Sequence, residues 1–275
     1  MNVNVPQDLA IAALEAEWRQ LDELLSGLTD EQWLASTPLP GWRVKDVVAH
    51  LIGTESMLLG DAAPEVEIPA AAHVRNDIGR FNEQWVVSMA AMPAETILAR
   101  FRQCTAERLA VLRSMDTNAW GAEGFTPAGK DTYGRFMRIR VFDCWLHEQD
   151  IRVAVDWPGG DGGAPVELAL DEMAVAMGFV VGKRAAAPPG SRVALELTGA
   201  AGRTINVERE AKDDARAVVV DELSGPATVT VRMPVGVFAR LAGGRAEPGT
   251  LRDHIEIDGD AELGERIASN LAYTI

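Results

Sequence analysis

Cysteine is scarce in this chain of 275 residues, which contains only Cys104 and Cys144. Both lie in segments with a helical pattern and belong to no spaced framework, so we expect a reducing, cytoplasmic compartment rather than disulfide bonds. No apolar run approaches the roughly 18 residues that a membrane span needs. The N-terminus lacks the basic region of a signal peptide. These absences predict a soluble protein.

Positively charged residues are also few, because the chain has 26 Lys and Arg but 41 Asp and Glu, which gives a net charge of −15. An acidic surface argues against nucleic acid or an anionic membrane as the main partner. The sequence contains no GxGxxG, P-loop, GxSxG or paired CxxC motif. These absences disfavour dinucleotide binding, nucleotide hydrolysis, serine hydrolase chemistry and a zinc ribbon.

The pattern divides into a helical part, residues 1–155, and a mixed part, residues 165–275, joined by a linker rich in Gly and Pro. The first part predicts an all-α bundle, with a long loop at 116–134. In the second, a helix precedes segments of alternating polarity, which predict an α+β domain with an antiparallel sheet. The expected strands are 192–199, 203–210, 215–222, 227–233 and 255–260.

The segment 138–151 predicts a helix, on which Asp143, His147 and Asp150 stand at positions i, i+4 and i+7 and so share one face. A carboxylate and an imidazole one turn apart can bind a divalent metal or act as an acid–base pair. The same spacing also suits a structural histidine paired with a carboxylate. Asp150 has two interpretations as well, since it could orient His147 or form a salt bridge on the helix face, with Arg152 or with a neighbouring helix.

His50 lies among apolar residues of a second predicted helix, which begins near residue 43. A lone histidine in such a setting is more often part of the core than a ligand. In a bundle, however, facing helices can bring it opposite the Asp143 face, which is how bundles build metal sites. We expect His73 at the surface and assign Arg138 and Arg140 to solvent.

Two segments of the first part, LPGWRVKDVVAHLIG (39–53) and RVFDCWLHEQDIR (140–152), resemble the metal-binding four-helix bundle of mycothiol-dependent maleylpyruvate isomerases, which is a DinB-like bundle. In the second part, FARLAGGRAE (238–247) and IEIDGDAELGERI (255–267) resemble the small sterol-carrier-like domain that follows in this family. The resemblance implies a DinB-like domain over 1–155 and a sterol-carrier-like α+β domain over 165–275.

The resemblance also implies that His50, Asp143 and His147 bind a divalent metal, typically zinc. Asp143 departs from the family, which usually has glutamate here, and its carboxylate lies about 1.5 Å nearer the backbone. The two helices that contribute the ligands therefore have to lie closer together than in the family, or the metal is bound differently, or it has been lost.

The implied function is a metal-dependent transferase or isomerase that takes mycothiol as cosubstrate and acts on a small electrophile. The family also uses an arginine of the C-terminal domain, for which Arg245 is the nearest match; a turn residue is the alternative. Two other functions stay open on the sequence. One is a non-catalytic small-molecule or lipid-binding protein with a degenerate metal site, and the other is a purely structural two-domain fold.

Overall fold

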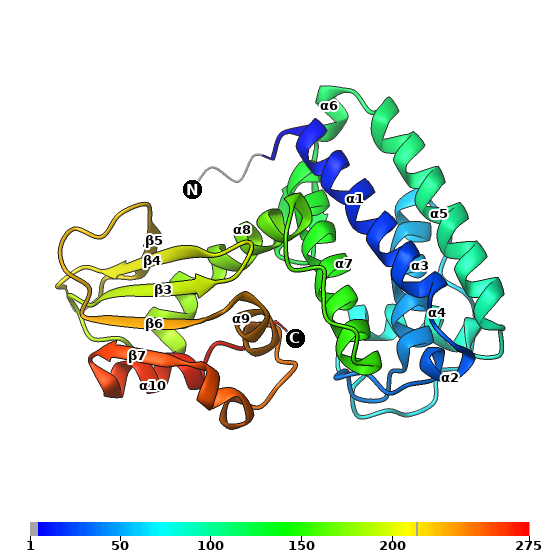
Figure 1. The fold of residues 1–275 in the computed structure, drawn as a ribbon. Helices are drawn as coiled ribbons and strands as arrows, with labels where there is room; N and C mark the ends of the chain where they lie inside the picture. The colour runs from blue at the N-terminus through cyan, green and yellow to red at the C-terminus, as the bar shows by residue number, and fades with distance from the viewer. Residues whose placement is uncertain (1–4, 213, 275) are drawn as a thin grey trace. The chain divides into compact units, whose positions relative to one another are not determined.

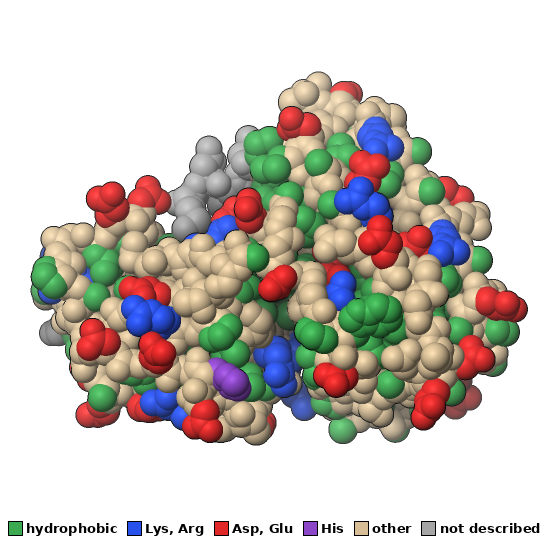
Figure 2. Space-filling view, in the orientation of Figure 1, with side chains coloured by type: hydrophobic (Ala, Val, Ile, Leu, Met, Phe, Trp, Pro, Cys, Tyr) green, Lys and Arg blue, Asp and Glu red, His purple; other side chains and the backbone are tan. Residues whose placement is uncertain are grey.

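The computed structural model describes residues 5–212 and 214–274, and the chain separates into two compact units. The first ends at Gly160 and the second begins at Asp161. Among the described residues, no helix is long and apolar enough to cross a membrane. Asp and Glu side chains are scattered over the face seen in Figure 2, interspersed with single Lys and Arg side chains, as the net charge suggests.

The N-terminal unit is a helical bundle, as predicted (Figure 1). Its long helices pack around one apolar core, and α4 lies against the outer side of α3. At the start of α2, Thr29 and Gln32 form a capping box, in which each side chain accepts from the backbone N–H of the other residue. The helices are α1 (Gln7–Ser26), α2 (Asp30–Trp33), α3 (Val44–Leu59), α4 (Asp77–Met89), α5 (Ala94–Ser114), α6 (Thr117–Trp120) and α7 (Tyr133–Val155).

The predicted loop at 116–134 is wrong, because α6 and a hairpin of β1 (Glu123–Thr126) and β2 (Gly129–Thr132) form there. The hydroxyl of Thr126 accepts from the Ala128 amide and donates to the Gly129 carbonyl, which closes the turn. Gly129 has a φ of +105°, which favours glycine. The strands are short and mostly exposed, so they leave little apolar alternation to detect.

Helix α3 is buried along most of its length and lies very close to α4. Gly53 permits this approach, since a Cβ atom there would stand 2.3 Å from Cγ of Trp85. Helix α7 is unusual because it buries charged side chains as well as apolar ones. After it, the chain folds back, and Trp145 donates its indole N–H to the Gly160 carbonyl at 2.7 Å.

The C-terminal unit is an α+β domain with a five-stranded sheet of order β5-β4-β3-β6-β7. Its pairs are antiparallel except β3 with β6, which are parallel. Helix α8 packs on β4 and β5, and α10 packs on β6 and β7, against the apolar face of the sheet (Figure 1). The elements are α8 (Ala164–Phe179), a π-helix (Val180–Arg184), β3 (Arg192–Thr198), β4 (Arg203–Arg209), β5 (Ala217–Val220), β6 (Val229–Pro234), α9 (Val235–Ala242), a 3-10 helix (Pro248–His254), β7 (Glu256–Gly259) and α10 (Ala261–Ser269).

Candidate metal centre

Helices α3 and α7 bring His50, Asp143 and His147 together, with one donor atom from each residue within 4.8 Å of the others. His50 Nε2 lies 3.2 Å from Asp143 Oδ2, and His147 Nε2 lies 3.6 Å from Asp143 Oδ1. The i, i+4 spacing on α7 sets the second contact, while packing of α3 on α7 supplies the first. Both imidazoles are buried, whereas the Asp143 side chain is 30% exposed, so the cluster opens to solvent beside the carboxylate.

The spacing of these atoms fits a shared ion. Ligand bonds of about 2.0–2.2 Å in tetrahedral geometry place two donor atoms about 3.3–3.6 Å apart. The contact of His147 Nε2 with Asp143 Oδ1, at 3.6 Å, lies at the upper end of this range, while His50 Nε2 lies 3.2 Å from the other oxygen, Oδ2. Two imidazoles and one carboxylate are ligands that suit zinc and related divalent metals. The shorter aspartate therefore reaches the cluster, because α3 and α7 sit close enough.

The two imidazoles are held in different ways. His147 Nδ1 lies 3.0 Å from Asp150 Oδ2, so its other nitrogen, Nε2, faces Asp143. A carboxylate behind a ligating histidine in this way fixes the ring and makes it a better ligand. Nδ1 of His50 is buried and has no hydrogen-bond partner among the described residues. Packing orients this ring, since the Trp42 ring centroid lies 5.4 Å from it and 6.4 Å from that of His147.

Electrostatics favour the protonation states that a metal requires. Burial lowers the pKa of His50 below its ordinary value, and the nearby Asp143 carboxylate opposes this only in part. Burial by itself raises the pKa of Asp143, but the Arg140 guanidinium and the two imidazoles lower it well below its usual range. A neutral His50 and an ionised Asp143 follow, and these are the charge states that metal ligands of these types adopt.

Trp42 forms one wall of the site and is held in place by residues outside the cluster. Its indole N–H donates to Glu83 Oε2 at 3.1 Å, and the same oxygen lies 3.1 Å from His73 Nε2. His73, predicted at the surface, has a side chain that is 25% exposed and belongs to this contact. No sequence pattern indicated this arrangement, because Trp42, His73 and Glu83 come from two connecting segments and α4.

The assignment of Arg138 and Arg140 to solvent is wrong, since both side chains are buried. Arg140 donates to Asp143 Oδ2 at 2.5 Å and to Glu55 Oε1 at 2.8 Å. Asp150 contacts His147, and Arg152 pairs with Glu148 at 2.7 Å. Asp150 thus lies where its first interpretation requires, and its role in orienting His147 stays a prediction.

Arg245 lies in the C-terminal unit, in the turn after α9, where its Nη1 donates to the Gly243 carbonyl at 2.6 Å. Its predicted role at the active site stays a prediction.

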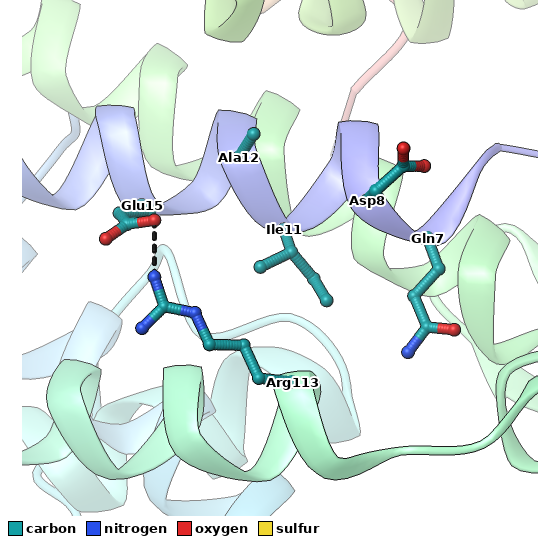
Figure 3. Close-up of a pocket in the computed structure, with 6 residues that line it drawn as sticks. All are labelled: Gln7, Asp8, Ile11, Ala12, Glu15 and Arg113. Carbon is teal, nitrogen blue, oxygen red and sulfur yellow. Dashed lines mark hydrogen bonds and ion pairs between the residues drawn. The ribbon is translucent and has the colours of Figure 1, made fainter.

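A separate groove lies between α1 and the end of α5 (Figure 3). It has a volume of about 520 Å³ and is open to solvent. Arg113 and Glu15 form an ion pair across it at 2.6 Å, and Ile11 lies between the helices. None of the three clustered residues lines the groove, so it is not part of the candidate metal centre.

Comparison with known families agrees with this architecture. A sequence profile of the mycothiol maleylpyruvate isomerase N-terminal domain matches residues 14–152, and a profile of the C-terminal domain of the same family matches residues 167–266. The chain belongs to the mycothiol maleylpyruvate isomerase family. Both sequence segments that contain the clustered residues fall within the first match.

Solved structures show that the chain shares the fold of the mycothiol maleylpyruvate isomerase family. The crystal structure of the mycothiol-dependent maleylpyruvate isomerase has a TM-score of 0.56 and 16% identity, and it covers 92% of this chain and 93% of that one. A mutant of that enzyme with a histidine replaced by alanine has a TM-score of 0.54. A match to a sterol carrier protein has a TM-score of 0.26, so the sterol-carrier-like character stays a prediction.

Two uncharacterised proteins, from two strains of Mycobacterium tuberculosis, are also similar to this family member. Each is 28% identical over 151 residues, which is 53% of this chain and 56% of the relative. The chain thus matches about half the length of these curated relatives.

Proposed function

We propose that this protein is a metal-dependent thiol transferase or isomerase that uses mycothiol as cosubstrate and acts on a small electrophilic compound. The observation that carries the proposal is the cluster of His50, Asp143 and His147, whose donor atoms lie within 4.8 Å of one another. Three protein ligands leave a further coordination position free, as in catalytic rather than structural zinc sites. Membership of a family named for mycothiol supports the choice of thiol.

A divalent cation bound there, with zinc the first candidate, would lower the pKa of an incoming thiol so that it reacts as a thiolate. The protein's own residues orient the ligands and shape the approach. Asp150 holds the His147 ring, while Trp42 provides an apolar wall beside both imidazoles. The cluster is open beside Asp143, where a small substrate can enter.

The chain's own thiols do not suit the role of nucleophile. Burial raises the pKa of Cys104 to about 11. Burial also raises the pKa of Cys144 above its ordinary value, against the opposing effect of Arg140. A reactive cysteine needs a lowered pKa and access to solvent. An external thiol is therefore the better candidate, and mycothiol together with two buried free cysteines is consistent with a cytoplasmic enzyme.

For Arg245 we propose contact with a carboxylate of the substrate, since a guanidinium binds carboxylate through two hydrogen bonds. Arg245→Met is then expected to raise KM for a carboxylate substrate while leaving the metal content unchanged. An unchanged KM would remove Arg245 from the site.

Elemental analysis of protein purified without chelator tests the proposal first. About one zinc or related ion per chain is expected in the wild type, with loss in His147→Ala. His254→Ala is the matched control, because this exposed histidine belongs to the C-terminal unit. Turnover of maleylpyruvate, or of another small electrophile, is then measured with and without mycothiol. Metal-free wild type whose turnover does not depend on thiol would refute the proposal.

A further inference from the structure

Three buried charged side chains lead to Asp143 inside the N-terminal unit, and we call Arg108, Glu55, Arg140 and Asp143 the charge row. Arg108 Nε donates to Glu55 Oε2 at 2.9 Å, and Arg140 Nε donates to Glu55 Oε1 at 2.8 Å. Arg140 Nη1 then donates to Asp143 Oδ2 at 2.5 Å. The side chains of the first three residues are 0–3% exposed, so solvent hardly screens their charges.

The charge row is anchored at the end away from Asp143. Arg108 also donates through Nη2 to the Tyr133 hydroxyl at 2.9 Å, at the start of α7. Glu55 is fixed because each of its two oxygens accepts from a different arginine. Charged hydrogen bonds in a dry interior are strong and directional, and losing one partner of a buried pair is costly. Arg140 therefore has little freedom to change position.

The two oxygens of Asp143 have different neighbours. Oδ2 accepts from Arg140 at 2.5 Å and lies 3.2 Å from His50 Nε2, while Oδ1 lies 3.6 Å from His147 Nε2. We propose that Arg140 is a positioning residue, held by Glu55 and Arg108, that fixes Asp143 as a one-oxygen metal ligand through Oδ1. The inference rests on the proposed metal site and identifies a residue that neither binds the metal nor contacts the reacting atoms.

An arginine beside a cation site could instead weaken binding by repulsion. Glu55 offsets this, because its carboxylate lies 2.8 Å from Arg140 and is itself buried. Behind Asp143, which is itself a proposed ligand, the charge row contains two arginines and one carboxylate and so carries one net positive charge, with Arg108 separated from Asp143 by Glu55. We expect the effect of the row on the direction of the Asp143 carboxylate to outweigh the remaining repulsion, so removal of Arg140 should loosen metal binding.

Cobalt binding to the full-length, metal-free protein tests this inference, because Co²⁺ both competes with zinc and reports its geometry through its visible absorption spectrum. The variants are Arg140→Gln and, should that one fold poorly, Arg140→Met, which leaves the Arg108–Glu55 pair intact. Loss of an outer residue that orients a metal ligand typically weakens metal binding about 10- to 100-fold. We expect a loss of this size together with an altered cobalt spectrum, in protein whose circular dichroism matches the wild type.

Arg152→Gln is the matched control, since it breaks a buried ion pair with Glu148 on the same helix without touching Asp143. Its Co²⁺ affinity should stay within about threefold of the wild type. Folded Arg140 variants with unchanged or tighter affinity and an unchanged spectrum would overturn the inference alone. An equal loss in Arg152→Gln would also overturn it, since α7 would then be loosened in general. Wild-type protein that binds no Co²⁺ would refute the proposed function as well.

Discussion

Asp150 offers the sharpest test of how the metal ligands are held. Its carboxylate lies 3.0 Å from His147 Nδ1 and is 2% exposed, so its charge acts on the imidazole with little screening. Asp150→Asn keeps the shape and removes the charge. Loss of a carboxylate that hydrogen-bonds to a metal-binding histidine typically lowers metal affinity about 10- to 100-fold, which corresponds to about 1.4–2.7 kcal/mol. We therefore expect a zinc affinity lower by that factor.

The same loss should appear in thermal stability. A ligand that binds the folded state alone stabilises it according to its concentration and affinity. In a unit of this size, 1 kcal/mol shifts Tm by about 2–4 °C. At the same excess of zinc, the rise in Tm should therefore be about 3–11 °C smaller in Asp150→Asn than in the wild type. Chelator competition measures the affinity, and differential scanning calorimetry with and without zinc measures the rise.

Asp46→Asn is the matched control for this prediction. Asp46 is also buried and lies on α3, where its carboxylate accepts from the backbone and side chain of Arg43. The variant should lose stability with and without zinc but keep its zinc affinity. Equal zinc affinities for wild type and Asp150→Asn would refute the argument that the Asp150 charge strengthens His147 as a ligand.

Three further predictions concern the bundle around the site. Burial and, to a smaller extent, the neighbouring Glu148 carboxylate raise the pKa of Glu17 well above its usual range. The Glu17 carboxyl group therefore binds its proton more tightly in the folded state than in the unfolded state. Stability should then fall as pH rises through the raised pKa, and urea unfolding across pH should show a flatter dependence in Glu17→Gln. Gly53→Ala should lower stability by about 1–3 kcal/mol in the same assay, because the new Cβ would meet Trp85 at 2.3 Å; a more stable variant would contradict this packing. Trp42→Ala removes two ring contacts of about 0.5–1.5 kcal/mol each and should lower stability by about 1–3 kcal/mol. Because the Trp42 ring orients His50, the variant should also bind zinc more weakly in chelator competition, and an unchanged zinc affinity would contradict that role.

The sequence indicated the clustered residues because one helix carries two of them at i, i+4, and the resemblance pointed to the third. It failed for Arg140, since periodicity within one helix places an arginine in solvent unless its partner is known. That partner, Glu55, lies 85 positions earlier, on α3. For the sheet, too, the local pattern was informative, because segments of alternating polarity predicted the strands. The parallel pairing of β3 with β6 depends on contacts between distant segments.

The hydrogen bond between Trp145 and Gly160 has a consequence for truncated forms of the protein. Periodicity ends the helical part near Val155, and α7 itself ends there. A fragment cut at that point would lose the carbonyl that accepts from the Trp145 indole, and an unpaired buried donor costs about 1–3 kcal/mol. It would also lose the Gly159 and Gly160 carbonyls that accept from Gln149. An N-terminal fragment meant to keep its native stability should therefore extend through Gly160, which makes the first residues of the linker part of the bundle.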